Sequence, residues 1–324
     1  MRIFRTGRPP RRPRVLTAAL TGLATAACLG LTGAGAAHAT PAKAAAETVP
    51  AQAATDPVGP PQDGFLAALG YSLLHPDAVP TGANDWSCRP SAAHPRPVVL
   101  VHGTFENRYA NWAGLAPKLK GQGYCVFALN YGGGPGPLMG TGDIPTSAAR
   151  LAEFVDEVRA ATGAAEVDLV GHSQGGVMPR YYIKHLDGAG KVGRLVALSP
   201  TNHGTSLWGL GLLARAFPGG ESLLGLACTA CAQQVTGSDF LRELNAGGET
   251  HPGVSYTVIA TWYDEVVTPY TSSFLAPGPN VVNQRVQDFC PLAFTEHLDI
   301  NYHDVSGRLV LNALDPAHAQ RPAC

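Results

Sequence analysis

Short apolar runs alternate with amphipathic segments along the chain from about residue 95. Residues 97–101 are almost continuously apolar and end at His102-Gly103, which is typical of a buried parallel strand. Segment 146–162 places Leu151, Phe154, Val155 and Val158 on one helical face and ends at Gly163. Similar patterns predict strands at 125–129, 167–170, 195–198, 255–260 and 281–286, and helices at 175–184 and 302–314. The alternation predicts an α/β fold with a mostly parallel sheet and helices on both faces.

The charge is unevenly distributed along the 324 residues, and this narrows the function. The formal net charge is −1, but the first 39 residues contain six arginines and no acidic residue. The remaining 285 residues have 17 basic against 24 acidic side chains, a net charge of −7. We therefore do not expect this chain to bind nucleic acid, because such binding requires a basic surface. Hydrophobic residues make up 45% of the chain and charged residues 15%, which argues against disorder.

The N-terminal residues have the pattern of a secretory signal peptide. A basic segment, 1–14, precedes an apolar stretch, 15–31, and Ala37-His38-Ala39 supplies the small residues of a cleavage site. We therefore expect a signal peptide at 1–39 and a secreted chain with no integral membrane segment after its removal. The pair Arg11-Arg12 leaves both the general and the twin-arginine export routes open. Residues 40–62 are rich in Ala and Pro and predict a tail or linker, followed by one catalytic domain at 63–324.

Six cysteines remain after the signal peptide, an even number in an exported chain. They predict three disulfides, for which fifteen pairings are possible. The spacing of Cys228 and Cys231 also occurs in half of a zinc site, but no second such pair is present, so a local disulfide is favoured.

The segment Gly171-His172-Ser173-Gln174-Gly175 has the Gly-x-Ser-x-Gly pattern of a nucleophile elbow. It lies between a predicted strand and a predicted helix, which is the context this motif requires. A sharp turn there exposes the hydroxyl of Ser173 beside a helix N-terminus that favours negative charge. The oxyanion of an acyl-transfer reaction then needs two N–H donors. We expect them to be the amides of Gln174 and of Thr104, which follows the first long apolar run, with the Thr104 hydroxyl as a further donor.

An acid and a histidine should follow the nucleophile in this fold, in that order. Asp264 lies just after the predicted strand at 255–260 and is the expected acid, with Glu265 as the alternative. His297 lies in a predicted loop before the C-terminal helix and is the expected base. His303 is its rival, although its place in the first helical turn favours capping, and His251 precedes Asp264 and breaks the order.

These motifs resemble those of secreted bacterial lipases of the class 2 type, within the α/β-hydrolase superfamily, and of a fungal lipase of the B type. The likeness runs from about residue 97 to 297 and rests on the segments 101–104, 171–176, 197–205, 263–267 and 295–297. The resemblance implies the α/β-hydrolase fold, the triad Ser173, Asp264 and His297, and oxyanion donors at Thr104 and Gln174. It also implies the disulfides Cys88–Cys125 and Cys290–Cys324, which leaves Cys228–Cys231.

Segment 204–227 contains more large apolar residues than an ordinary surface loop. In this fold it would lie over the site, as an acyl-chain pocket or a mobile lid, or alternatively as a packed helix pair. The expected substrate-binding residues are Leu207, Trp208, Leu212, Leu213 and Phe217.

The sequence thus predicts a monomeric serine ester hydrolase, a triacylglycerol lipase that acts on lipid esters, including esters at a lipid–water interface. We expect no cofactor and no metal, because zinc-protease, Walker and dinucleotide motifs are absent from the sequence. The alternatives are a short-chain carboxylesterase, a polyester hydrolase, a secreted acyltransferase and a non-catalytic lipid-binding relative.

Overall fold

A computed structural model describes residues 56–133, 136–220, 222 and 228–324. The predicted signal peptide at 1–39, and residues 40–55 of the predicted tail, lie outside the described residues. The end of that tail belongs to the folded domain, because Val58–Gly59 forms β1 and pairs in parallel with β2, Val79–Pro80. The hydroxyl of Tyr109 donates a hydrogen bond to the carbonyl of Pro60. Because Gly59 has no side chain, this segment can lie directly against the tyrosine ring.

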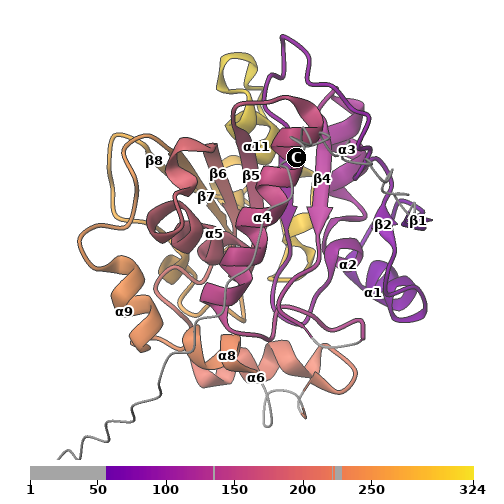
Figure 1. Ribbon diagram of the computed structural model, residues 1–324. Helices are drawn as coiled ribbons and strands as arrows, with labels where there is room; N and C mark the ends of the chain where they lie inside the picture. The colour runs from indigo at the N-terminus through magenta and orange to yellow at the C-terminus, as the bar shows by residue number, and fades with distance from the viewer. Residues whose placement is uncertain (1–55, 134–135, 221, 223–227) are drawn as a thin grey trace, which may run out of the picture. The chain divides into compact units, whose positions relative to one another are not determined.

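Six parallel strands form the central sheet in the order β4-β3-β5-β6-β7-β8, which confirms the predicted α/β architecture (Figure 1). The strands are β3 Val98–Val101, β4 Val126–Leu129, β5 Val167–His172, β6 Val192–Leu198, β7 Ser255–Ala260 and β8 Val281–Arg285. The chain runs outward from β3 to β4 and then crosses back to β5 on the other side of β3. This reversal creates a switch point at the carboxyl ends of β3 and β5, where α/β sheets bind ligands.

Helices cover both faces of the sheet, as the alternating pattern predicts. The helices α4 Ile144–Thr162 and α5 Gln174–His185 pack on one face, and α3 Leu115–Gly121 and α11 Asp304–Leu314 pack on the other. Alternate residues of β3 divide between the two sides: Val99 and Val101 join the first core, and Val98 and Leu100 join the second. Within α4, the buried face includes the four large apolar residues that the sequence places on one side.

Shorter helices complete the described part of the domain. They are α1 Phe65–Leu74, α2 Arg108–Trp112, α6 Leu207–Arg215, α8 Thr229–Gln233, α9 Asp239–Asn245 and α10 Val286–Phe289. Figure 1 shows α6 and α8 beyond the carboxyl ends of the strands, on the side of the switch point. None of the helices in the described segments is long and apolar enough to cross a membrane.

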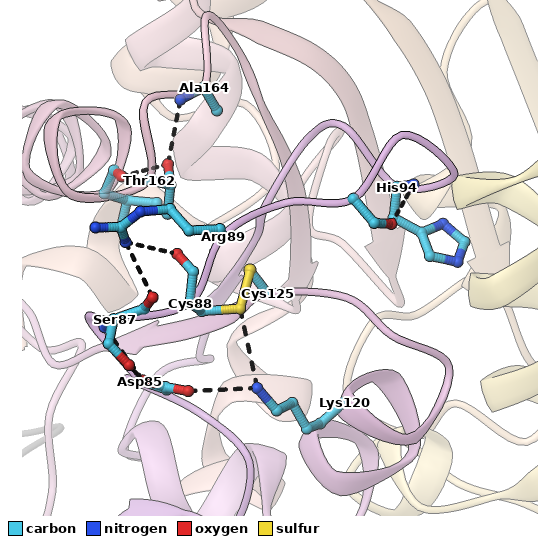
Figure 2. Close-up of a disulfide and its surroundings, with 11 residues drawn as sticks. Asp85, Ser87, Cys88, Arg89, His94, Lys120, Cys125, Thr162 and Ala164 are labelled. Carbon is cyan, nitrogen blue, oxygen red and sulfur yellow. Dashed lines mark hydrogen bonds and ion pairs between the residues drawn. A yellow bond between two sulfur atoms is a disulfide. The ribbon is translucent and has the colours of Figure 1, made fainter.

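Three disulfides join the cysteines in the pairs that the family resemblance implies: Cys88–Cys125, Cys228–Cys231 and Cys290–Cys324. Figure 2 shows the first of these, which ties a long loop to the residue directly before β4. Lys120 lies beside this disulfide and forms an ion pair with Asp85 at 3.5 Å.

Candidate active site

Ser173 occupies a sharp turn between β5 and α5. Its backbone is left-handed, with φ 53° and ψ −121°, a conformation that costs energy for any residue except glycine. The turn closes only because its neighbours lack side chains: a Cβ on Gly171 would lie 1.8 Å from the carbonyl of Gly175, and one on Gly175 would lie 2.1 Å from that of Val101. The amide of Ser173 donates to the carbonyl of Leu198 at 2.9 Å. These contacts fix the direction of the serine hydroxyl.

The structure brings Ser173, His297 and Asp264 into one hydrogen-bonded chain. The Oγ of Ser173 lies 3.1 Å from Nε2 of His297, and Nδ1 of His297 lies 3.0 and 3.1 Å from the two carboxylate oxygens of Asp264. Asp264 stands in the turn after β7, where its Oδ1 also accepts the amides of Val266 and Val267 at 3.1 and 2.7 Å. All three side chains are buried. A serine, a histidine and a carboxylate in this geometry are equipped for nucleophilic catalysis.

Burial and pairing act in opposite directions on the acid and the base. Burial alone raises the pKa of Asp264, but the nearby His297 and the backbone amides lower it below the ordinary value of 3.8. Burial lowers the pKa of His297, but the carboxylate of Asp264 outweighs it and raises this pKa above 6.5. The pair therefore favours a carboxylate that stabilises positive charge on the imidazole.

The alternative residues lie elsewhere. Glu265 accepts the backbone amide of His297 at 3.3 Å and forms no hydrogen bond with its ring. His303 caps the N-terminus of α11, and its Nδ1 faces a backbone amide of that helix. His251 contacts the backbone of its own turn. Of the histidines considered as bases, His297 is the one whose ring lies between the serine and an acid.

The predicted oxyanion residues lie next to Ser173, but the hydroxyl of Thr104 and the side-chain oxygen of Gln174 are already paired. The hydroxyl of Thr104 donates to Oε1 of Gln174 at 2.7 Å and accepts from Nε2 of Gln234 at 2.9 Å. Thr201 in turn donates to Oε1 of Gln234 at 3.0 Å. The amides of Thr104 and Gln174 donate no hydrogen bond to any other described residue. Among the described residues, the backbone amides of Thr104 and Gln174 are thus free donors, as is Nε2 of Gln174, and Gln234, which the sequence did not suggest, fixes the hydroxyl of Thr104.

The five predicted substrate-binding residues divide into an exposed and a packed group. Leu207 and Trp208, at the start of α6, are 73% and 68% exposed, and Leu212 is half-buried. Leu213 and Phe217 are buried, and the ring of Phe217 packs against Phe65 and Phe105 with centroids 5.6 and 5.8 Å apart. Residues 221 and 223–227 of the predicted lid lie outside the described residues.

Three exposed aromatic residues next to Asp264 and His297 were not anticipated. Trp262 and Tyr263 directly precede the acid, and Phe294 lies three residues before the histidine. The rings of Tyr263 and Phe294 pack together with centroids 4.7 Å apart. Their proximity to the site depends on two segments that are about 30 residues apart in the sequence. No local pattern in the chain indicates it.

Metal-binding residues do not converge within the described segments. No group of three or more His, Cys, Asp or Glu side chains there has an arrangement that could hold an ion.

Residues 95–299 match the family model described as lipase (class 2). Two curated proteins called triacylglycerol lipase, from Pseudarthrobacter phenanthrenivorans and Burkholderia plantarii, are each 39% identical over 100 residues, or 28% of this chain. The aligned part is 28% and 25% of their lengths, so the chain spans about a quarter of the curated relatives it matches.

Two solved structures are similar in fold. Aspergillus fumigatus lipase B superposes with a TM-score of 0.59 at 22% identity, over 76% of this chain and 56% of that one. A Bacillus licheniformis lipase in its mature form gives a TM-score of 0.50 at 20% identity, over 72% of this chain and 95% of that one.

Proposed function

The chain belongs to the class 2 lipase family, and we propose that it is a serine ester hydrolase, a triacylglycerol lipase that cleaves the carboxylic esters of lipids. The observation that carries this proposal is the hydrogen-bonded chain from Asp264 through His297 to Ser173. We further propose that residues 1–39 direct the protein out of the cell and are removed. Three disulfides support an oxidising, extracellular location.

In the proposed reaction, Ser173 attacks the ester carbonyl while its proton moves to Nε2 of His297. Nδ1 of His297 donates to Asp264, which sets the tautomer of the ring and stabilises the imidazolium that forms. The amides of Thr104 and Gln174 are the donors for the oxyanion. His297 then gives its proton to the departing alcohol, leaving an acyl-enzyme. Water, deprotonated by the same imidazole, releases the fatty acid and restores Ser173.

The apolar residues around the site support a lipid substrate. Leu207 and Trp208 are exposed on α6, whose first turn packs on the segment that carries Asp264: a Cβ on Gly209 would lie 2.1 Å from the carbonyl of Val266. Exposed aromatic side chains at 262, 263 and 294 lie in the segments of the acid and the base. Such exposed apolar groups beside a hydrolytic site suit a long acyl chain better than a small soluble ester.

The test is hydrolysis of p-nitrophenyl esters from C2 to C16 and of emulsified triglyceride, by the wild type and by Ser173→Ala. We expect cleavage of long-chain esters and triglyceride, and a loss of more than about 10³-fold in Ser173→Ala. Ser72→Ala is a matched control, since Ser72 is equally buried but donates to a carbonyl within α1.

The other outcomes identify the alternatives. Activity confined to C2 esters would indicate a short-chain esterase, and release of soluble acids from a polyester film would indicate a polyester hydrolase. Transfer of the acyl group to an added alcohol in preference to water would indicate an acyltransferase. Undiminished activity in Ser173→Ala would refute the proposed chemistry altogether.

A further inference from the structure

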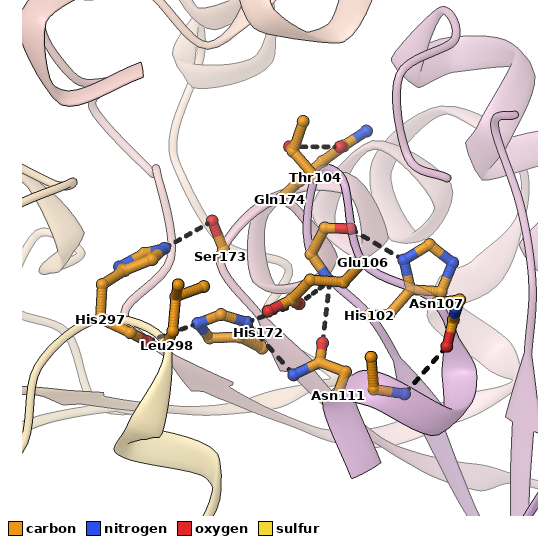
Figure 3. A network of polar contacts seen from close by, with 12 residues as sticks. His102, Thr104, Glu106, Asn107, Asn111, His172, Ser173, Gln174, His297 and Leu298 are labelled. Atoms are coloured by element: carbon orange, nitrogen blue, oxygen red, sulfur yellow. Dashed lines mark hydrogen bonds and ion pairs between the residues drawn. The ribbon is translucent and has the colours of Figure 1, made fainter. Parts of the chain in front are cut away.

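A second buried carboxylate–imidazole pair lies beside the proposed triad (Figure 3). Oε2 of Glu106 lies 3.0 Å from Nδ1 of His172, and the two side chains are 1% and 0% exposed. His172 is the residue directly before Ser173, and its ring centroid lies 4.8 Å from that of His297. The reaction proposed above gives neither member of this pair a role. Burying two ionisable groups is costly unless their hydrogen bonds compensate for it.

The pair contacts both segments that must stay aligned with the nucleophile. On one side, Nε2 of His172 donates to the backbone carbonyl of His297 at 2.9 Å. On the other side, Oε2 of Glu106 accepts the amide of Gly103, also at 2.9 Å. Oδ1 of Asn111 accepts the same amide at 2.9 Å, and its Nδ2 lies 3.3 Å from His172. The pair thus connects the loop of the base with the residue before Thr104.

The hydrogen-bond pattern fixes which way His172 donates. A carbonyl oxygen can only accept, so Nε2 of His172 carries a hydrogen. The contact between Nδ1 and Oε2 of Glu106 is a hydrogen bond when one of the two atoms carries a further hydrogen. Whichever atom carries it, the bond to the His297 carbonyl is present. His172 therefore cannot accept a proton at Nε2 and serves as a donor only.

The packing leaves no room for this arrangement to shift. A Cβ on Gly103 would lie 2.6 Å from Oε2 of Glu106, 3.1 Å from Nδ1 of His172 and 3.2 Å from Cβ of Ser173. The oxyanion loop, the buried pair and the nucleophile are therefore in direct contact. A displacement of the pair would move both the base and the oxyanion amides relative to the serine.

We propose that Glu106 and His172 are positioning residues for ester hydrolysis, which rests on the function proposed above. His172 fixes the backbone of His297, and Glu106 fixes that of Gly103, so that base and oxyanion donors keep their places around Ser173. Neither side chain touches the substrate. Their loss should therefore lower kcat and leave KM nearly unchanged. A misplacement of about 1 Å in a catalytic group can reduce the rate about 10²-fold.

Two substitutions of His172 separate positioning from burial. The side-chain amide of a glutamine can occupy the place of Nε2, whereas that of an asparagine reaches only the place of Nδ1. His172→Gln thus keeps the donor to the His297 carbonyl, and His172→Asn loses it. We expect kcat within about tenfold of wild type for His172→Gln and a loss of about 10²-fold for His172→Asn, with KM within about threefold in both.

Glu106→Gln tests the other half of the pair. Oε2 accepts from Gly103 and faces His172 at the same time, and an amide cannot do both. Its oxygen at this place could accept from Nδ1 only if the ring carried a second hydrogen without a counter-charge, and its nitrogen would point a hydrogen at the Gly103 amide. We expect kcat to fall at least about tenfold, again with little change in KM.

The experiment measures kcat and KM of the full chain on a short-chain p-nitrophenyl ester below its solubility limit, with the thermal midpoint of each variant. Asp168→Asn is the control for a buried ionic group: Asp168 lies at the opposite end of β5 and pairs with Arg96 at 2.7 Å. It should lower the midpoint but keep kcat within about twofold.

Equal kcat values in folded His172→Gln and His172→Asn would overturn the proposal, as would changes in KM alone. If neither histidine variant folds, a folded Glu106→Gln with wild-type kcat overturns it. The proposed function fails by a different result, namely wild-type turnover in Ser173→Ala. An inactive Ser173→Ala together with fully active pair variants would leave the hydrolase in place and remove only the positioning role.

Discussion

Asp264→Asn tests how the proposed triad sets the tautomer of its histidine. Oδ1 of Asp264 accepts two backbone amides, those of Val266 and Val267. An asparagine must keep its oxygen at that position, because a nitrogen there would face two N–H groups. Its NH₂ group then takes the place of Oδ2, 3.1 Å from Nδ1 of His297. The retained oxygen still lies 3.0 Å from Nδ1, but the charge of the carboxylate is gone, and an amide donor beside Nδ1 favours a lone pair there and hence a ring proton on Nε2.

The expected effect on the rate is large, and the effect on stability is small. A proton on Nε2 prevents His297 from accepting the proton of Ser173, and a base in the wrong tautomer lowers kcat by roughly 10⁴-fold. This corresponds to about 5 kcal/mol of transition-state stabilisation. Stability changes less because asparagine has the same shape and keeps the two backbone hydrogen bonds. Removing a buried charge also offsets part of the lost ion pair.

The assay compares kcat on a soluble short-chain ester with the thermal midpoint for Asp264→Asn and Glu265→Gln. Glu265 is the neighbouring acid, and its carboxylate accepts the His297 amide but forms no hydrogen bond with the ring. Its substitution should cost less than about tenfold in kcat. The reasoning is refuted if Asp264→Asn loses less than tenfold, or if both variants lose activity to the same extent.

Two further predictions concern pH and the disulfides. Burial lowers the pKa of His297 but Asp264 raises it above 6.5, so kcat/KM should rise along a limb centred above that pH. A limb of kcat/KM centred at or below pH 6.5 would contradict this prediction. Protonated His297 also stabilises the fold fully below pH 6.5 and less as the pH rises through its folded pKa, which urea unfolding from pH 5 to 10 would measure. Replacing Cys88 and Cys125 by serine should cost about 4 kcal/mol of unfolding free energy, because they are 37 positions apart, against about 2 kcal/mol for Cys228 and Cys231, which are three positions apart. Equal losses in urea unfolding would refute the chain-entropy reasoning.

The sheet could be predicted from the sequence because each strand is a local pattern. A run of apolar residues followed by a turn and a helix is visible within about 15 residues, and the elbow around Ser173 is contained in five. The sequence distinguishes Asp264 from Glu265 only by position, because two adjacent acids in a turn differ in the direction of their side chains. The amides of Val266 and Val267 decide between them in the structure, and no sequence pattern shows where an amide points.

The features that the sequence did not reveal join residues far apart in the chain. Glu106 and His172 are 66 residues apart in the sequence, and Gln234 donates a hydrogen bond to Thr104, which is 130 residues away from it. Glu, Gln and Thr side chains usually lie at the surface and His is intermediate, so burial could not be inferred from residue type. Their positions follow from the strand order, since the loops after β3 and β5 meet only where the chain reverses across the sheet.

The two buried imidazoles show why residue type and proximity to the serine are insufficient to identify a base. Both rings present Nδ1 to a carboxylate, and both lie within one residue or one hydrogen bond of Ser173. They differ in the group that Nε2 faces. For His297 it is a hydroxyl, which can give up a proton, and for His172 it is a carbonyl, which has none to give. The same acid–imidazole unit can therefore act as a base in one place and hold that base in position in the other, and the acceptor opposite Nε2 decides which.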